Sequence, residues 1–474
     1  MSRRPAPPLL AALLAASLTG CAAGALTHPP LDTPMPAGYA ADDAQWQPAQ
    51  DWSAQPAGAW WQVFADPELE ALQQQLQAHN QTLAAQLAAY DQAQAAVRQA
   101  QASYWPALNA SLGDTRARTA TSAGVSEQAS AEVTASWVPD LWGKVREQVR
   151  AQRANAQASA ATLRNVRLSL QATLAQSYLQ LRVVDAQRRL AQQAVDDTGK
   201  ALELTQNRYR AGVASAADVA SARTAYLQAQ TSLTDLGVTR AQLQNAIAVL
   251  VGQPPSGFSL RERDALPTIP AIPPGLPADL LQRRPDIAAA RAQVEAANAQ
   301  IGVAKSAWFP TLTLGGSAGH SAARLADVFS APVLLWSLGP QLAANLFDGG
   351  ARRAQVRSSE AGYRQAVANY RQTVLAALQG VENQLAAQRI LAAEAEQQAQ
   401  VVQAAEDALR LAQNQYKAGL APYLNVLTAQ STAINARNAE LTLRNRRYAA
   451  AVALIQALGG GWGDAVSAPL PADR

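Results

Sequence analysis

Two long stretches of the chain are almost free of proline. None occurs from Asp140 to Gln253, and Pro422 is the only one from Gln341 to Ala468. Proline interrupts the interior of a helix, so both stretches can be helical over most of their length. Apolar residues recur inside them mostly at every third or fourth position, as in a helix with one apolar face. The first stretch shows this at Val166, Leu170, Leu174, Tyr178 and Leu181, and the second at Val356, Tyr363, Val367, Tyr370, Val374, Leu378, Val381 and Leu385.

A helix from Lys144 to Asn207 would be far longer than a globular domain needs. Gly199 is the only glycine in this segment. At about 1.5 Å per residue, the helix would reach about 100 Å. Helices of this length build a shaft or a tube, and their apolar stripes allow them to pack as coiled coils. A periplasmic coiled-coil scaffold is the alternative, and the long stretches alone do not exclude it.

The two halves of the chain resemble each other. Ser103–Leu108 matches Ala307–Leu312 at an offset of 204 residues, and Tyr209–Val213 matches Tyr416–Leu420 at an offset of 207. Offsets this similar indicate a duplicated unit. We expect a first repeat over residues 66–253, built as helix, strand, strand, long helix, tip and helix. A proline-rich linker over 254–278 then leads to a second repeat over 279–458 and a tail over 459–474.

The N-terminus carries a bacterial export signal. Arg3 and Arg4 precede an apolar run from Pro8 to Leu18, which small residues close just before Cys21. The pattern is similar to a lipobox, which predicts a signal peptide over residues 1–20, acylation of Cys21, and a lipid-anchored extended leader over 21–65. A plain secretory signal with an incidental cysteine is the alternative. Several acyl chains on one residue would hold the protein firmly at a membrane.

Segments with a period of two indicate β-strands. Apolar and polar residues alternate over 131–137 and over 311–314, and residues 106–120 and 332–347 are two further candidates. Each has room for the roughly ten residues that a tilted membrane strand requires. Five tryptophans lie in or beside these segments, as expected where a barrel meets lipid headgroups, although they could instead pack a small soluble sheet. They are Trp105, Trp137, Trp142, Trp308 and Trp336.

Four strands cannot close a membrane barrel. About eight is the minimum, and unpaired strand edges are not tolerated in hydrocarbon. The barrel would therefore be shared between chains, and three copies leave more room for a conduit than two. No segment has eighteen uninterrupted apolar residues, so any spanning must be done by strands.

Composition argues against catalysis and nucleic-acid binding. One Cys and three scattered His predict no metal site and no cofactor, and 39 basic against 35 acidic residues are too balanced for a nucleic-acid footprint. Gly315–Gly319 matches the nucleophile-elbow pattern of hydrolases, but only His320 follows it. A catalytic triad cannot be assembled in that order, so we expect no enzyme.

The order of these features resembles the outer membrane factor (TolC-like) family of bacterial efflux systems, in its NodT/OprM-type lipoprotein branch. The resemblance rests on the lipobox, Trp60-Trp61, Phe64–Leu69, Asn80, the aromatic-proline pairs before the strands, Arg283–Ile287 and two Tyr-x-x-Gly turns. It implies a mainly α fold with a small β part and an internal two-fold repeat. Long coiled-coil helices would form a periplasmic α-barrel, and four strands per chain would contribute to a shared trimeric transmembrane β-barrel.

The resemblance also implies a function and partners. The protein would be the exit duct of a tripartite system, conducting small molecules passively from the periplasm to the outside. A homotrimer in outer membrane lipid would dock to a periplasmic adaptor and an inner-membrane pump. A lipid-anchored periplasmic coiled-coil scaffold or adaptor is the alternative, and the identity of the cargo stays open.

Site residues follow from the resemblance as well. Gly212 and Gly419 would lie at the periplasmic tips and, with Val213 and Leu420, touch the adaptor, although a glycine that merely ends a helix explains each of them as well. A second set on one helical face would narrow the closed aperture without charge: Leu424, Asn425, Thr428 and Ser431. Asp218 and Tyr416 match positions that link neighbouring helices, while Ala421 replaces a basic partner.

Overall fold

The computed structural model describes residues 59–118, 125–263, 265–272, 283–330 and 334–460. The predicted signal peptide, Cys21, most of the leader and most of the tail lie outside these ranges. The chain divides into two compact units. One contains the described residues of 88–161 and 289–372, with the four described strands, and the other contains the described residues of 59–87, 162–288 and 373–460.

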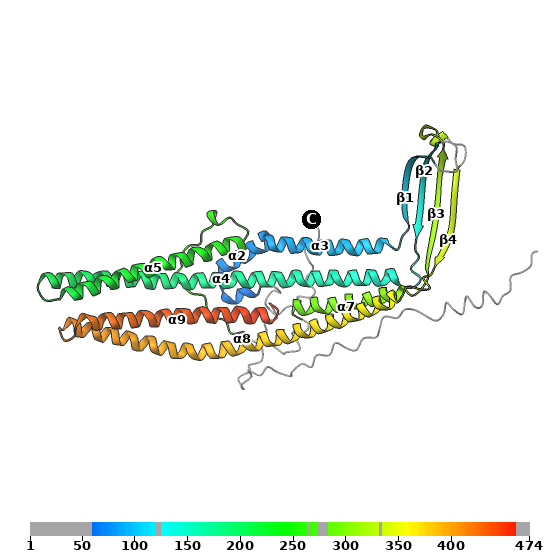
Figure 1. Cartoon of the computed structure of the whole chain (residues 1–474). Helices are drawn as coiled ribbons and strands as arrows, with labels where there is room; N and C mark the ends of the chain where they lie inside the picture. The colour runs from blue at the N-terminus through cyan, green and yellow to red at the C-terminus, as the bar shows by residue number, and fades with distance from the viewer. Residues whose placement is uncertain (1–58, 119–124, 264, 273–282, 331–333, 461–474) are drawn as a thin grey trace, which may run out of the picture. The chain divides into compact units, whose positions relative to one another are not determined.

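The first unit contains one four-stranded antiparallel sheet. Its strands are β1 (Ala107–Ala117), β2 (Ser126–Trp137), β3 (Thr311–Ala322) and β4 (Leu334–Ala343), paired in chain order (Figure 1). All four predicted strands are confirmed. Strands β1 and β4 each have one edge without a partner strand among the described residues.

Aromatic side chains fasten the ends of the strands. The indole N–H of Trp137 donates to the carbonyl oxygen of Tyr104 at 2.9 Å, and that of Trp142 donates to the carbonyl oxygen of Pro310. The Trp142 ring stacks on Phe309 with their centroids 4.9 Å apart. Trp137 and Trp142 lie at and after the end of β2, while Tyr104 and Pro310 precede β1 and β3. The contacts therefore align these strands where they meet the helices.

The long helices reproduce the duplication. Helices α4 (Lys144–Arg210) and α8 (Ala351–Lys417) each have 67 residues, while α5 (Ala216–Leu250) and α9 (Tyr423–Ala457) each have 35. Helices α8 and α9 begin 207 residues after α4 and α5, respectively. The predicted two-fold repeat is confirmed in length as well as in order.

Among the described residues, no helix is long and apolar enough to cross a membrane.

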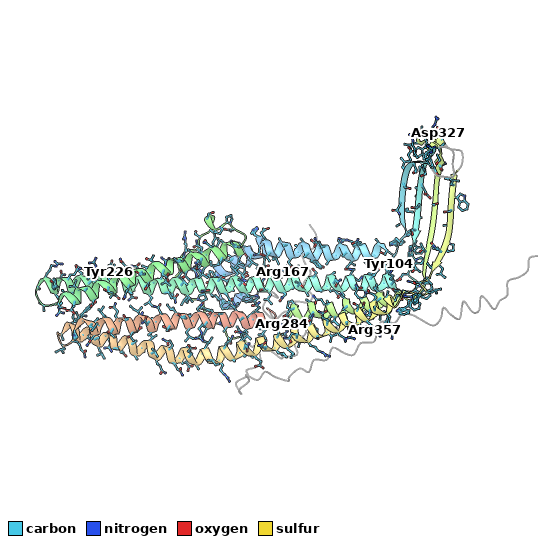
Figure 2. The ribbon with its side chains drawn as sticks, in the orientation of Figure 1. Tyr104, Arg167, Tyr226, Arg284, Asp327 and Arg357 are labelled. Atoms are coloured by element: carbon cyan, nitrogen blue, oxygen red, sulfur yellow. The ribbon has the colours of Figure 1, made fainter. Side chains whose placement is uncertain are left out.

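Gly199 is tolerated inside α4 because a neighbouring side chain uses the space it leaves. A Cβ atom added at Gly199 would lie 3.3 Å from the Tyr226 ring. Tyr226 belongs to α5, which returns alongside α4 in the second unit (Figure 2). The glycine thus allows the two helices to pack around an aromatic ring.

The start of the first repeat differs from the expected single helix. It has two helices, α2 (Pro67–His79) and α3 (Gln81–Ala102). In the second repeat, the described residues contain α7 (Pro285–Ser306), and Arg283 just before it is also helical. Asn80 separates α2 from α3: its side-chain amide donates to the carbonyl oxygen of Leu250 at 2.8 Å, and its side-chain oxygen accepts from the N–H of Leu83. One side chain therefore serves the end of α5 and the start of α3.

The end of the predicted extended leader is folded. Trp60–Phe64 form a short 3₁₀ helix, η2, in which Trp60, Trp61 and Phe64 are buried. The indole N–H of Trp60 donates to the side-chain oxygen of Gln171 in α4. Burial of three large aromatic rings outweighs the turn-forming composition of the surrounding sequence, so the packed fold begins before residue 66.

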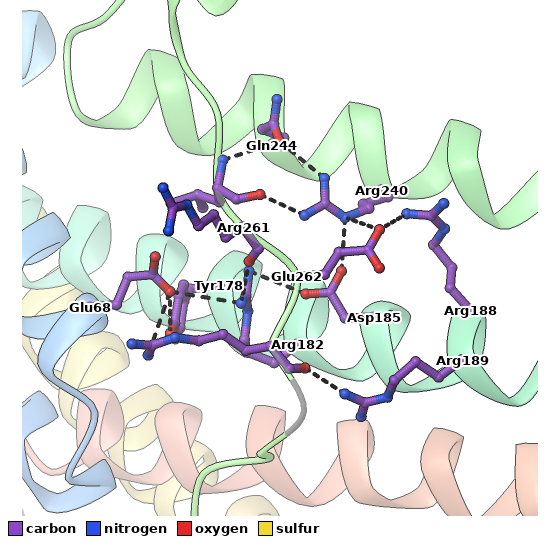
Figure 3. A network of polar contacts seen from close by, with 12 residues as sticks. Glu68, Tyr178, Arg182, Asp185, Arg188, Arg189, Arg240, Gln244, Arg261 and Glu262 are labelled. Atoms are coloured by element: carbon purple, nitrogen blue, oxygen red, sulfur yellow. Dashed lines mark hydrogen bonds and ion pairs between the residues drawn. The ribbon is translucent and has the colours of Figure 1, made fainter.

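Charged side chains of α4 and α5 hold the linker between the repeats (Figure 3). Arg182 donates to the carbonyl oxygen of Arg261 at 2.9 Å, and Arg240 donates to the carbonyl oxygen of Leu260 at 2.7 Å. Arg240 also pairs with Asp185 at 2.8 Å. Arg182 and Asp185 are both fully buried. Buried charges require such partners, so removal of any one of them would leave another uncompensated.

Gly252, just after the end of α5, packs against His79 at the end of α2, and this contact can be tested. Its φ is +74°, and an added Cβ would lie 2.3 Å from the carbonyl oxygen of His79. We expect Gly252→Ala to lower the free energy of unfolding by at least about 1 kcal/mol from backbone strain alone, before the clash is counted. Loss of helical circular dichroism on heating measures it. Gly257→Ala is the control because Gly257 has open space and no positive φ; an equal loss of stability in both variants would contradict this account.

Candidate functional site

The two helix hairpins turn with the same backbone geometry. Gly212 follows α4 with φ +73°, and Gly419 follows α8 with φ +75°. At the first tip, the N–H of Gly212 donates to the oxygen of Tyr209 at 2.9 Å, and the N–H of Val213 donates to that of Arg208 at 2.8 Å. The second tip repeats both bonds at the equivalent positions, from Gly419 and Leu420. This pair of bonds around a left-handed glycine is the Schellman motif.

The tips present small and apolar surface. Val213 is 64% exposed and Leu420 is 81% exposed. A Cβ atom added at Gly212 or Gly419 would meet nothing within 4 Å. The structure therefore places all four predicted adaptor-contact residues at the open ends of their hairpins. Their contact with an adaptor stays a prediction.

The helices that leave the two tips begin differently. The Ser215 hydroxyl accepts from the N–H of Asp218, and the Asp218 carboxylate accepts from the N–H of Ser215 at 3.0 Å, which makes a capping box at the start of α5. At the equivalent positions of α9 stand Pro422 and Asn425, and Pro422 makes no side-chain cap. The duplication has therefore kept the turn and changed the cap.

The capping box sets the ionisation of Asp218. The backbone N–H of Ser215 and then its hydroxyl lower the pKa of the Asp218 carboxyl, and Arg208 adds a smaller electrostatic effect in the same direction. The carboxylate predicted to link neighbouring helices is thus engaged within its own helix start. Its role as an inter-helix link stays a prediction.

Arg208 connects the two hairpins and was not anticipated from the sequence. Its guanidinium carbon lies 4.7 Å from the centre of the Tyr416 ring, so the end of α4 touches the end of α8. The Tyr416 ring in turn lies 5.3 Å from that of Tyr423 at the start of α9. Because this contact joins residues about two hundred positions apart, no local sequence pattern predicts it. Arg208 supplies a positive charge near Tyr416. In the family that the sequence resembles, the basic partner stands at the position of Ala421.

An apolar cluster lies behind these contacts. Tyr423, Val426 and Ala222 are buried together, against partly buried residues of α4 and α8. Burial, and then the neighbouring Tyr416, raises the pKa of Tyr423 to about 12. Its hydroxyl has no hydrogen-bond partner among the described residues. Tyr423 therefore stays neutral over the physiological pH range and acts through packing.

The four predicted aperture residues share one exposed face of α9. Leu424 is 61% exposed, and Asn425, Thr428 and Ser431 are exposed as well. The Thr428 hydroxyl donates to the carbonyl oxygen of Leu424 at 3.0 Å, so it is bonded within its own helix. The opposite face carries Tyr423, Val426, Gln430 and Ala433, which are buried. The predicted face is thus present and uncharged, while its position at an aperture stays a prediction.

A groove of about 460 Å³ opens beside this face, between α4, α5 and α9. It is lined mainly by small and amide side chains, including Gln187, Gln228, Gln430 and Asn435, with Asp235 as the one charged residue. Among the described residues, no group of three or more His, Cys, Asp or Glu could hold a metal ion.

The sequence profile described as "Outer membrane efflux protein" matches residues 72–253 and 276–460. The chain belongs to this family. The two matched segments correspond to the two repeats, and they contain both tips and all four strands. The resemblance inferred from the sequence motifs is therefore confirmed.

Named relatives and solved structures agree with the profile. OpmQ of Pseudomonas aeruginosa, a pyoverdine export outer membrane protein, is 35% identical over 416 residues, which cover 85% of this chain and 87% of OpmQ. Outer membrane protein OprJ of the same species is 31% identical, and the match covers 97% of each chain. The open state of the MtrE outer membrane channel of Neisseria gonorrhoeae matches with a TM-score of 0.80 at 27% identity, covering 91% of this chain and 97% of MtrE.

This outer membrane efflux protein is a channel component of an efflux system. It resides in the outer membrane and extends into the periplasm, as its relatives do. Its family consists of channels and not of enzymes. The predicted fold class, function and location are confirmed.

The Asp218 cap predicts a pH-dependent contribution to stability. Because folding lowers the pKa of Asp218, its stabilisation is present above the ordinary value of 3.8 and is lost as the pH falls through the lower value of the folded state. We expect Asp218→Asn to melt at a lower temperature than the parent near neutral pH and to approach the parent as the pH falls below 3.8. Asparagine occupies the equivalent position in α9, so the shape is tolerated. A melting difference that stays constant over this range would show that the carboxylate charge is not involved.

Proposed function

We propose that the protein is a homotrimeric exit duct of a tripartite efflux system. It conducts small molecules passively once it is docked to a periplasmic adaptor and an inner-membrane pump. The observation that carries the proposal is the four-stranded sheet, whose two edges have no partner strand among the residues that the structure describes. In hydrocarbon such edges require partner strands, and three copies supply the twelve strands of a barrel wide enough to conduct.

The lipid anchor is part of the proposal. Cys21 lies at the end of a signal with the lipobox pattern and is the only cysteine of the chain. Acylation of its thiol and of the new N-terminal amine would tether the mature chain to outer membrane lipid. The strands would hold the channel in the membrane independently of this anchor.

The tips would act as the docking and gating end. Gly212, Val213, Gly419 and Leu420 offer exposed backbone and small apolar groups that suit a helical hairpin of an adaptor. The contact of Arg208 with Tyr416 would hold the two hairpins together in the closed state. The uncharged face at Leu424, Asn425, Thr428 and Ser431 would narrow the aperture by size rather than by a ring of charge.

Cargo selection would rest mainly with the pump. OpmQ is named for pyoverdine export, and other relatives are named for antibiotic and toluene efflux. We propose a small-molecule cargo for this chain without choosing among these classes. The duct itself has no enzymatic role and uses no cofactor.

Removal of the anchor separates this proposal from an anchored periplasmic scaffold. Cys21→Ala, exported with an ordinary signal peptide, should remain in the outer membrane fraction because its strands still span the bilayer. The extracted complex should have the mass of three chains once bound detergent is subtracted. The parent protein, treated in parallel, is the control. Release of the variant into the soluble periplasm, or a monomer in several mild detergents, would favour the scaffold.

A second test concerns the aperture. Thr428→Asp would place three carboxylates around the narrowed end, and we expect divalent cations to block the pore more strongly than in the parent. Conductance of the reconstituted trimer, with and without Mg²⁺, measures the effect. Thr442→Asp is the matched control because Thr442 is also exposed on α9 and bonds its own helix in the same way, at 2.8 Å, but lies farther from the tip. Equal block in both variants would count against this position for the aperture.

A further inference from the structure

The strand register assigns every strand residue to one of two faces. Residues directly opposite each other in an antiparallel pair have side chains on the same face. One row across the sheet is therefore Leu108, Ala135, Gly316 and Leu338, and the next on that face is Ala110, Val133, Ala318 and Trp336. Leu108, Val133, Trp336 and Leu338 are at least half exposed. A face this apolar turns toward lipid when the sheet spans a bilayer, and the opposite face turns toward the water-filled interior.

The interior face consists mainly of hydroxyl, amide and glycine residues. Side chains on this face form hydrogen bonds between neighbouring strands. The hydroxyl oxygens of Ser317 and Ser337 lie 3.0 Å apart, and the Gln128 amide donates to the Ser321 hydroxyl at 3.3 Å. One row of this face is Asn109 with Thr134 and Ser317, and another is Ser111 with Glu132 and Gly319. The face is therefore polar but almost without charge.

Glu132 is the one ionisable residue that the described strands place on the interior face. The other four lie on the apolar face by the same register: Asp114, Arg116, Glu127 and His320. Arg116 and Glu127 form an ion pair at 3.3 Å. Glu132 has no hydrogen bond or ion pair with any other described side chain. The described strands place no positive charge on the face of Glu132 to compensate its carboxylate.

The neighbours of Glu132 leave room for its side chain. Ser111 lies opposite it on β1 and Gly319 lies opposite it on β3, and the row ends at Leu335 on β4. A Cβ atom added at Gly319 would lie 2.3 Å from the carbonyl oxygen of Ala131 and 3.1 Å from the Glu132 Cβ. Glycine is thus the residue that fits beside Glu132. The carboxylate stands near the middle of β2, well inside the span of the sheet.

We propose that Glu132 determines the charge preference of the barrel interior. Three copies form a ring of carboxylates midway along the strands, which attracts cations and slows anions. This inference rests on the proposed trimer. In water-filled space the field of the ring reaches about one Debye length, roughly 10 Å at 0.1 M salt, so it acts on solutes that pass beside the wall. The predicted aperture face is uncharged and narrows the duct by size. The barrel interior would therefore select by charge and the aperture by size.

Charged thiol reagents can measure the potential beside Glu132 without any opening of the tips. A Ser111→Cys reporter lies directly across from Glu132 on the same face. Cells that express it are treated with a cationic and with an anionic methanethiosulfonate, and the ratio of the two reaction rates is recorded. The ratio cancels any change in the ionisation of the thiol itself. The parent chain, whose only cysteine is Cys21, gives the background.

We expect the cation-to-anion rate ratio to fall about fivefold or more when Glu132→Gln is added to the reporter. The matched control is Glu127→Gln, which removes the same charge from the opposite face of the same strand and should leave the ratio unchanged. A reporter that reacts but shows the same ratio with Glu132 and with Gln would overturn the inference and leave the channel proposal intact. A reporter that does not react at all would overturn the inference and also count against a water-filled barrel, which the mass of the extracted complex tests separately.

Discussion

The structure of this protein depends on the hydrogen-bonding requirement of backbone groups in a membrane. The described part of one chain supplies four strands in the order β1-β2-β3-β4, and within it the outer edges of β1 and β4 have no partner strand. In water such edges could be solvated, but in hydrocarbon each unpaired N–H and C=O costs several kcal/mol. In the proposed trimer, closure with other copies satisfies these groups. It also explains why one face of the sheet exposes Leu108, Trp336 and Leu338, which would be unfavourable in water.

The duplication explains the helical part, because the second repeat uses helices of the same lengths and the same turn as the first. Two helices of 67 residues and two of 35 are joined by turns that use the same pair of hydrogen bonds around a left-handed glycine. The repeats differ at the starts of the helices that follow the two tips. Ser215 and Asp218 cap α5, while Pro422 and Asn425 stand at the same places in α9 and leave its first turn without a charged cap. The face predicted to narrow the aperture begins at this changed cap.

Much of the architecture could be predicted from local pattern. Long intervals without proline, three-four spacing and period-two segments located the long helices and all four strands. The features that were missed depend on contacts between distant residues. Asn80 divides α2 from α3 because it also bonds Leu250, and Trp60–Phe64 fold because α4 provides Gln171 and a buried surface. Arg208 reaches Tyr416 only because the two hairpins lie together at their ends. None of these partners is near in the sequence.

The sequence by itself determined the elements, their duplication and the chemical character of each face, because helix and strand periodicity and glycine turns are properties of neighbouring residues. Only the tertiary structure decided which side chains meet. The strand register placed Ser111 and Gly319 beside Glu132, and it placed Arg116 opposite Glu127, where the two form an ion pair. The packing of α4 and α5 against the linker gave the buried Arg182 the carbonyl oxygen of Arg261 and the buried Asp185 the guanidinium of Arg240, and buried charges require such partners. Register and packing are set by contacts across long stretches of chain, and local sequence carries no direct record of them.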